Sequence, residues 1–454
     1  MKFIISAVLA VVYTFFMYLF IFGILIFKHP LFIDSDLSYT IDDMLVPSVN
    51  AQHAMLVEEP LFALDVRLAL IEKATQSIDI STYSIHDDES RDIIFGALVI
   101  AANRGVKVRL IVDGFIEGRG YNDSEVINHL ASHPNIDVAY YEVFSIFKPY
   151  AVQNRLHDKF FIIDSMYGLI GGRNIGDRYF FPSDIPTKDR DVLIYGNPSK
   201  AVNDMQSYYE ELFNSPFTIH LDIINGNPNK FTENYQNYLS TYLPSLDVLL
   251  DPLYDETSKV DNVTFLHSPL TRLYKQPVIM SLLIDLAEDY DEIIIQSPYI
   301  IFSREFFKLF NPPYDQDIIM ITNHPYINPN LLATSGYIKY REFLTEHVEL
   351  YENQARTSLH MKTIVYGDNV SVIGSLNFDP RSAFLSTESA VIIYDQAFTQ
   401  KLKTEIDHYL SNSLLVLDDL SYEEGQVEAI SYSRQRRMLV HVVAWFTNLF
   451  DEML

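Results

Sequence analysis

Near the start of the chain, residues 3–27 form an apolar stretch that contains no charged side chain. A helix of about 20 apolar residues crosses the hydrocarbon core of a bilayer, so this stretch is long enough to span it. A cleaved signal peptide has an apolar region of about 7–15 residues that ends at small residues. This stretch instead ends Leu25-Ile26-Phe27-Lys28. The pattern therefore favours an uncleaved transmembrane anchor over residues 1–28 rather than a signal peptide or a buried helix.

Residues 29–58 are polar and irregular, and they predict a linker. From residue 59 onwards, apolar positions recur alternately with the period of helices and of strands. The predicted helices cover residues 61–73, 92–104 and 124–132, and the predicted strands cover residues 77–83, 106–112 and 136–141. Alternating helices and strands predict an α/β domain with a parallel or mixed sheet, which we place at residues 59–215.

The second half of the chain repeats this order. Its predicted helices cover residues 278–289 and 337–347, and its predicted strands cover residues 292–298, 318–323 and 348–351. A helix between the first two of these strands is less clear than in the first half. The repeat predicts an internal duplication with a second α/β domain at residues 256–415. Residues 216–255, which include the turn-rich sequence NGNPN, predict a linker between the domains.

Two polar motifs, one in each half, share their spacing. Counting from the histidine, lysine stands at +2, glycine at +14 and asparagine at +17. The first copy is His157, Lys159, Gly171 and Asn174, and the second is His360, Lys362, Gly374 and Asn377. The apolar run after each lysine predicts a buried strand, and residues two apart in a strand face the same side. The glycine predicts a turn at which the backbone can approach a ligand closely.

Imidazole, ammonium and amide groups on one surface suit a phosphate ester. Lysine neutralises the phosphoryl oxygens, and histidine attacks phosphorus or transfers a proton. One motif alone is incomplete, because displacement at phosphorus needs a nucleophile on one side and an acid behind the leaving oxygen. Two copies that face each other across a pseudo-two-fold axis would supply His157 and His360 for these two tasks.

This duplicated pattern resembles the phospholipase D superfamily, with its His-x-Lys-x4-Asp signature and Gly-Gly/Ser-x-Asn continuation. LASHPNIDV at residues 130–138, GGRNIGDRYF at 171–180, NFDPRS at 377–382 and Thr387-Glu388 resemble the bacterial cardiolipin synthase C-like branch. The resemblance covers residues 59–454. It implies two pseudo-symmetric α/β/α sandwich domains with mixed sheets. It also implies a phosphohistidine intermediate formed on the N-terminal histidine, His157.

The aspartate of the signature differs between the copies. Asp164 stands at +7 in the first, whereas the second has Gly367 there and Asp368 at +8. An odd offset faces away from the histidine and lysine if the strand continues. We therefore expect Asp164 and Asp368, although they belong to the motif, to be local structural groups.

A carboxylate follows each motif and precedes a strand, Asp189 in the first half and Glu388 in the second. A carboxylate bonded to the far ring nitrogen fixes a histidine tautomer and stabilises its imidazolium form. In the family, a carboxylate at this place serves the motif histidine. Glu388 matches that position, and Asp189 competes with Asp191 for it.

The net charge is −27, and the 454 residues contain no cysteine. Disulfides and thiolate metal sites are therefore excluded. Strong acidity argues against a nucleic-acid partner, because phosphate contacts need a basic face. It still allows a local basic pocket. The basic residues near the motifs are Lys148, Arg155, Arg173, Arg178, Arg356 and Arg381.

Residues 416–454 predict a helical extension. Its last part, from Arg434 onwards, has a basic start and an amphipathic pattern. Such a helix docks on the core or lies on a lipid surface. The charges flanking the N-terminal anchor, Lys2 and Lys28, leave the side of the catalytic domain open, with the outside favoured.

Together with the resemblance, these features predict a membrane-anchored phosphatidyltransferase without a metal or other cofactor. The resemblance implies phosphatidylglycerol, phosphatidylethanolamine or cardiolipin as its lipid substrate. If water is the acceptor, the same mechanism gives a phospholipase D that releases phosphatidic acid. A phosphodiesterase acting on nucleic acid and an inactive lipid-binding protein are the remaining alternatives.

Overall fold

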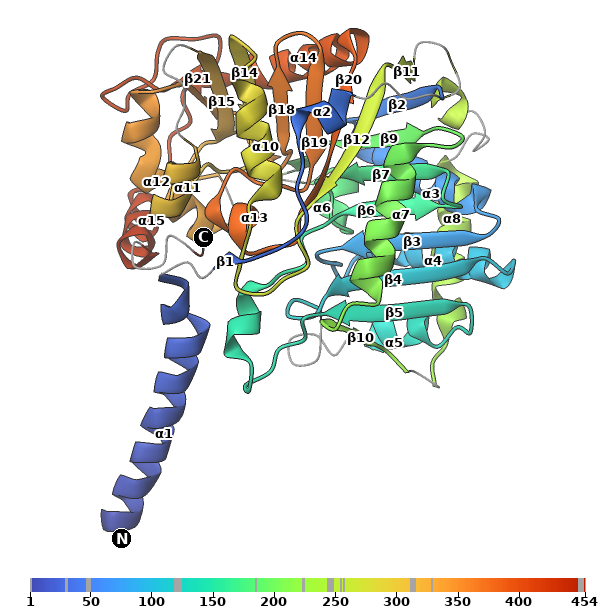
Figure 1. Ribbon diagram of the computed structural model, residues 1–454, viewed down its shortest axis with the longest axis horizontal. Coiled ribbons are helices and arrows are strands. Elements are labelled where there is room, and N and C mark those ends of the chain that lie inside the picture. Colours follow the sequence, from blue (N-terminus) through green and yellow to red (C-terminus); the bar gives the residue numbers. More distant parts are fainter. Residues whose placement is uncertain are drawn as a thin grey trace.

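The computed structural model describes residues 2–28, 32–45, 50–117, 125–183, 186–222, 225–242, 249–253, 255, 258–310, 316–327, 330–447 and 453. Two α/β domains lie side by side, and one long helix projects away from them (Figure 1). This helix is α1 (Lys2–Gly23), and it continues into the short helix η1 (Leu25–Lys28).

The first domain is built on a nine-stranded sheet with the order β10-β5-β4-β3-β6-β7-β9-β2-β11. Strands β3, β4 and β5 are parallel, and the other pairings are antiparallel. The strands are β2 (Gln52–Val57), β3 (Ser77–Thr82), β4 (Lys107–Asp113), β5 (Ile136–Tyr141), β6 (Phe160–Ile163), β7 (Tyr167–Gly171), β9 (Asp191–Tyr195), β10 (Thr218–His220) and β11 (Lys259–Val260).

The second domain has an eight-stranded sheet with the order β12-β20-β19-β18-β14-β15-β16-β21. Its central strands β14, β15 and β16 are again parallel, and the others are antiparallel. The strands are β12 (Asn262–His267), β14 (Glu292–Gln296), β15 (Asp317–Asn323), β16 (Glu349–Asn353), β18 (Thr363–Tyr366), β19 (Val370–Gly374), β20 (Ser389–Tyr394) and β21 (Ser413–Leu415). The two sheets follow one plan, which confirms the predicted pair of mixed-sheet domains.

Helices cover the faces of both sheets (Figure 1). Those of the first domain are α3 (Pro60–Lys73), α4 (Glu89–Asn103), α5 (Glu125–Ala131), α6 (Asp177–Phe180), α7 (Lys200–Phe213) and α8 (Thr232–Tyr242). Those of the second are α10 (Val278–Ala287), α11 (Arg304–Leu309), α12 (Leu331–Thr345), α13 (Pro380–Phe384), α14 (Gln396–Leu410) and α15 (Arg434–Thr447). The helix that was unclear in the sequence is α11, which has only six residues.

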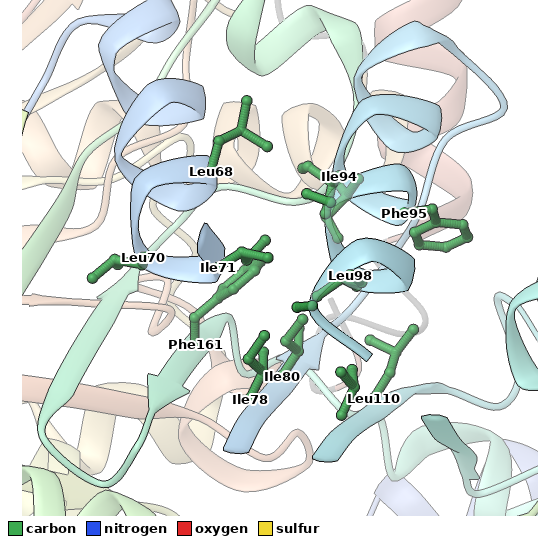
Figure 2. Close-up of a cluster of buried hydrophobic side chains, with 14 of the residues drawn as sticks. Leu68, Leu70, Ile71, Ile78, Ile80, Ile94, Phe95, Leu98, Leu110 and Phe161 are labelled. Carbon is green, nitrogen blue, oxygen red and sulfur yellow. The ribbon is translucent and has the colours of Figure 1, made fainter. Parts of the chain in front are cut away.

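Each domain has a core of its own between its sheet and its outer helices. Figure 2 shows this core in the first domain, where Ile71 of α3 and Leu98 of α4 lie against Ile78 and Ile80 of β3. A third apolar cluster belongs to both domains. It joins side chains of the first sheet, such as Ile162 and Ile170, to side chains of the second, such as Val365 and Val391. This shared cluster holds the two sheets together and so fixes the relative position of the motifs.

The segment 29–58 is more ordered than the predicted linker. β1 (Phe32–Ile33) pairs with β13 (Tyr274–Lys275), and α2 (Ile41–Leu45) follows it. Residues 52–57 form β2, between β9 and β11 in the first sheet, because their apolar side chains are buried there. The prediction of an irregular linker over the whole segment was therefore wrong.

The segment 216–255 also belongs largely to the first domain. β10 extends the sheet beside β5, and α8 packs on α4 with Tyr235 in the core. Close approach is possible because Gly96 has no side chain, and a Cβ atom there would lie 2.3 Å from the Phe231 oxygen. The short helices η3 (Pro228–Phe231) and η4 (Asp251–Leu253) complete the segment. The inter-domain linker was thus predicted too long, and the second sheet begins only at β12.

Candidate active site

The histidines of the two motifs line one cavity of about 520 Å³ that is formed by both domains. Each precedes the strand that the sequence predicted, since β6 and β18 begin three residues after His157 and His360. Asn174 and Asn377 line the same cavity. The duplicated motifs therefore meet in space, although they lie in different halves of the chain.

The carboxylates cross between the domains. Nδ1 of His157 donates to Glu388 of the second domain, at 2.8 Å to Oε1 and 3.0 Å to Oε2. Nδ1 of His360 donates to Oδ2 of Asp189 in the first domain, at 2.6 Å. With Nδ1 protonated in this way, Nε2 is the ring nitrogen that remains for chemistry. Each histidine is thus oriented by the domain to which it does not belong.

Backbone hydrogen bonds hold this crossed arrangement in register. The amide of His157 donates to the Thr387 carbonyl oxygen at 3.1 Å, and the amide of His360 donates to the Lys188 carbonyl oxygen at 2.7 Å. Beside the second contact, β17 (Ser358–Leu359) pairs with β8 (Thr187–Lys188) as two parallel strands. The residue after each acceptor carbonyl is the orienting carboxylate, so the same contact positions both members of the pair.

The motif lysines are buried beside the histidines. Lys159 Nζ donates to the carbonyl oxygen of His157, and Lys362 Nζ donates to that of His360. Burial lowers the pKa of Lys159 to about 7 and that of Lys362 to about 8. Lys362 Nζ also lies 2.9 Å from Nδ1 of His360. Because Nδ1 of His360 already donates its hydrogen in the hydrogen bond to Asp189, it cannot accept one from Lys362. The contact between Lys362 and this nitrogen is therefore electrostatic and not a hydrogen bond.

The surroundings of both imidazoles favour their neutral form. Burial, followed by the charges of Lys159 and Lys362, holds the pKa of His157 well below its usual value. Burial and Lys362 lower the pKa of His360 to about 3, although Asp189 opposes this shift. The lysines of both motifs act on His157, which is a second sign that the two half-sites converge. A bound anion would reduce this accumulation of positive charge.

Each motif asparagine lies beside a tyrosine hydroxyl. Nδ2 of Asn174 is 3.1 Å from the Tyr179 hydroxyl, and Nδ2 of Asn377 is 3.0 Å from that of Tyr299. Within the described part of the chain, the Oδ1 atom of each has no hydrogen-bond partner although it is buried. If oxygen and nitrogen are exchanged, the tyrosine donates to Oδ1 and the amide N–H groups become available to a phosphoryl oxygen.

The motif glycines have a different role from the one we predicted. A Cβ atom on Gly171 would lie 2.3 Å from the Arg190 carbonyl oxygen, and one on Gly374 would lie 2.3 Å from that of Ser389. A Cβ atom on Gly172 would lie 2.2 Å from Oδ1 of Asp189. These glycines allow the strand that follows each carboxylate to approach closely. They make room for the partners of the histidines rather than for a ligand.

The signature aspartates lie outside the lining of the cavity. Asp164 accepts hydrogen bonds from the amides of residues 75–77 at 2.8–2.9 Å. Asp368 is exposed and contacts Lys403 at 3.0 Å. The φ angle is +52° at both Asp164 and Gly367, which are the two +7 positions. The chain therefore turns at the same position in both copies, and glycine adopts this φ angle in the second without strain. The turns differ at +8, where Ser165 also has a φ of +52° and Asp368 has no positive φ.

Asp191 is not a competitor for a histidine. Its carboxylate accepts from Arg67 at 2.9 Å and from Arg173 at 3.0 Å in a buried cluster. Arg155 lines the cavity but pairs with Asp113 at 2.8 Å.

Several lining residues were not assigned a role from the sequence. Tyr83 contacts the His157 ring edge-on at 5.1 Å, and Tyr179 contacts the His360 ring at 5.5 Å. Arg178 and Arg381 both line the cavity and both stand at +21 from their motif histidine. That shared offset is a signal that the sequence contains. Within the described residues, there is no group of three or more His, Asp or Glu side chains that could hold a metal ion.

Comparisons with known proteins identify the family and the fold that this chain shares. The family model described as "Cardiolipin synthase, PLD-like domain" matches residues 68–213 and 282–410, which is more than half of the chain. The chain is 28% identical over 401 residues to cardiolipin synthase C of Escherichia coli, covering 76% of this chain and 82% of that protein. It is also 28% identical over 433 residues to an uncharacterised protein of Helicobacter pylori, covering 82% of each.

Among solved structures, the phosphatidylserine synthase of Haemophilus influenzae has the same fold. The TM-score is 0.65 at 15% identity, and the match covers 89% of this chain and 97% of that one. At this identity the similarity concerns the fold alone. It confirms that two such domains pack together in one chain.

Proposed function

The chain belongs to the family of the cardiolipin synthase PLD-like domain, and on that premise we propose that it is a membrane-anchored phosphatidyltransferase. One observation carries the proposal. Two imidazoles line one cavity, and each is oriented by a carboxylate of the opposite domain. Such a pair provides a nucleophile and an acid on two sides of one phosphorus atom.

In the first half-reaction, Nε2 of His157 attacks the phosphorus of a phospholipid diester. The bond to the headgroup oxygen breaks, and His360 donates a proton to that oxygen as the alcohol leaves. In the second, His360 removes the proton of an acceptor hydroxyl, which attacks the phosphohistidine and releases His157. The assignment of His157 as nucleophile follows the order that is usual in the family.

The lysines and asparagines of the motifs hold the phosphoryl oxygens in this scheme. Lys159 and Lys362 are buried with lowered pKa values, so each gains strongly from an anion beside it. The bound phosphodiester raises the pKa of both imidazoles from their depressed values, which makes a proton available on His360. Ammonium and amide groups thus provide the charge stabilisation of the transition state.

Three observations support phospholipid as the substrate class. The cavity is lined in part by apolar side chains, among them Phe115, Ile116 and Leu332. The helical stretch Phe3–Lys28 is apolar and long enough to cross a membrane, and none of its most apolar window is buried by the rest of the protein. The net charge of −27 opposes binding to nucleic acid.

The acceptor separates the two candidate activities of this site. A hydroxyl of phosphatidylglycerol as acceptor gives cardiolipin, and water gives phosphatidic acid. We favour the lipid hydroxyl because the matched family model and the Escherichia coli relative carry the name cardiolipin synthase.

The decisive experiment incubates the full-length protein in mixed vesicles of phosphatidylglycerol and phosphatidylethanolamine and analyses the products by mass spectrometry. We expect cardiolipin to accumulate, with glycerol or ethanolamine released. Phosphatidic acid as the only product would identify a hydrolase instead. Phosphorus NMR of a denaturant-quenched reaction is expected to show phosphohistidine, and its absence during rapid turnover would contradict the covalent intermediate. For variants that replace the motif histidines, His220→Ala, at an exposed position of β10, is the matched control.

A further inference from the structure

The loop between β5 and η2 (Pro149–Gln153) carries large apolar side chains that face solvent. Phe144 is 43% exposed, Ile146 is 42% exposed and Phe147 is 79% exposed. Residues 143–148 have the sequence VFSIFK, which contains no carboxylate in a chain with 60 acidic residues. An exposed apolar cluster of this kind marks a surface that another apolar phase covers.

The same loop lies against the apolar helix α1. The Tyr18 hydroxyl donates to the carbonyl oxygen of Phe147 at 3.0 Å. Nearer the end of α1, Gly23 packs on Pro149, and Gln153 donates to the Gly23 carbonyl oxygen at 3.3 Å. Tyr18 precedes Gly23 by five residues, or about 7.5 Å of helix. In Figure 1 the loop and η2, drawn in teal, extend from the domains toward the side on which α1 projects. Whatever phase surrounds α1 at Tyr18 therefore also surrounds the tip of the loop.

The loop is also connected to the cavity. The ring of Phe144 contacts the ring of Phe115 edge-on, with 6.1 Å between centroids. Phe115 lines the cavity together with His157. A line of apolar side chains thus runs from the surface beside α1 to the candidate active site.

We propose that residues 143–148 insert into the bilayer beside α1 and form a path by which the acyl chains of the substrate stay in the membrane while its phosphate enters the cavity. This inference rests on the membrane anchor and lipid substrate of the proposed function. The occupant of the exposed surface is lipid, because the loop lies against α1, which belongs to an apolar helical stretch long enough to span a bilayer. Lys148 follows the apolar tip, where its ammonium group reaches lipid phosphates.

Insertion can be measured without any assay of activity, since the chain contains no cysteine. In the full-length protein, Phe147→Cys provides a unique site for an environment-sensitive fluorophore. The labelled protein is reconstituted into vesicles of phosphatidylglycerol and phosphatidylethanolamine that contain lipids with spin labels on their acyl chains. Val12→Cys, in α1, is the positive control. Leu417→Cys, at an exposed position after β21, is the negative control.

We expect quenching at positions 147 and 12 and none at position 417. Quenching at position 12 without quenching at 147 would overturn the inference and leave the proposed function intact. Quenching at neither position would overturn the anchor and the loop together. A blue-shifted but unquenched label at 147 would show that protein, such as a second copy of this chain, covers the loop.

A kinetic test separates membrane contact from chemistry. Phe147 does not line the cavity, so Phe147→Asp is expected to leave turnover of soluble dihexanoyl phosphatidylglycerol within twofold of wild type. On long-chain phosphatidylglycerol in vesicles, the same variant is expected to lose at least tenfold. Leu417→Asp should change neither rate. Equal losses on both substrates would contradict a role in membrane access.

Discussion

The two half-sites share their backbone plan but differ in how each holds its carboxylate. At the +15 position the first copy has Gly172, and its missing side chain leaves room for Asp189. The second copy has Ser375, whose hydroxyl donates to Glu388. Burial raises the pKa of Glu388 to about 7. Burial acts in the same direction on Asp189, but Lys362 and His360 outweigh it and lower its pKa.

The difference implies a division of labour. Asp189 is ionised and so stabilises an imidazolium on His360, as an acid–base group requires. Glu388, whose pKa is about 7, is about half protonated at pH 7. It therefore stabilises an imidazolium on His157 less than Asp189 does on His360, which favours the uncharged imidazole that a nucleophile requires. A pseudo-symmetric scaffold has thus become chemically asymmetric at the carboxylates. This assignment agrees with the order of the two histidine roles proposed above.

Replacing the histidines should have the largest effect and should distinguish the roles of the two half-sites. His157→Ala and His360→Ala are each expected to lower lipid turnover by about 1,000-fold or more. On a diester with a p-nitrophenol leaving group, which needs no proton to depart, His360→Ala should still form phosphohistidine. His157→Ala should not. Burst kinetics of p-nitrophenolate release distinguish the two, and a burst with His157→Ala would reverse the assignment.

Removing the charge of each carboxylate should give unequal effects. Asp189→Asn is expected to cost about 100-fold in kcat, because it removes a charge that His360 needs. At pH 6 Glu388 is mostly protonated, since its pKa is about 7, so Glu388→Gln should cost about tenfold or less. Above pH 7 wild-type Glu388 ionises, and the effect of this substitution should change with pH. The pH profiles of kcat measure both, and equal, pH-independent losses would remove the asymmetry.

Alanine substitutions at the +15 position should show how each half-site holds its carboxylate. Gly172→Ala places a methyl group where Asp189 now lies. It is therefore expected to displace that carboxylate from His360 and to lower kcat by about tenfold. Ser375→Ala removes the hydroxyl that donates to Glu388 and accepts from the Ser389 amide, and each of these hydrogen bonds is worth about 1 kcal/mol. Because the bond to Glu388 stabilises its ionised form, the loss of that bond should shift the Glu388 pKa upward in the kcat profile. If Gly172→Ala is fully active, the glycine does not set the carboxylate position.

Replacing the two signature aspartates should have different effects on the stability of the protein and no effect on catalysis in either case. Burial opposes ionisation of Asp164, but the amides that it accepts from lower its pKa. Its contribution is present above the unfolded pKa of about 3.9 and is lost as the pH falls through the folded pKa. Asp164→Asn should therefore cost about 1–3 kcal/mol at pH 7 and less at pH 3. Asp368→Asn should leave the thermal midpoint unchanged. Thermal unfolding in detergent at the two pH values tests this.

The features that could be predicted from the sequence are those that depend on local spacing. His157 and Lys159 lie two residues apart before an apolar strand, and the repetition of that spacing at His360 was enough to predict one composite site. The crossing of Glu388 and Asp189 to the opposite domain depends on contacts between residues more than 170 positions apart. No local pattern encodes such contacts. The shifted Asp368 became clear only from the φ angle at Gly367.

The linkers were predicted poorly for a related reason. Residues 52–57 and 232–242 are short or polar, and their burial depends on partners elsewhere in the chain, on β9 and on α4. The amphipathic segment after Arg434 docks on the core through one face, and its contact with a lipid surface stays a prediction. Val440 and Ala444 are buried as α15 packs on α12, while Met438, Val442 and Trp445 are exposed. Residues 448–452 of that segment lie outside the described part of the chain.

The apolar cluster common to both sheets has a consequence for the history of the chain. Ile162 and Val365 are buried in that one cluster, so neither half hides its inner sheet face when it is alone. The full-length protein should therefore melt in a single cooperative transition rather than lobe by lobe. A half-length ancestor would have needed a second copy of itself to cover that face.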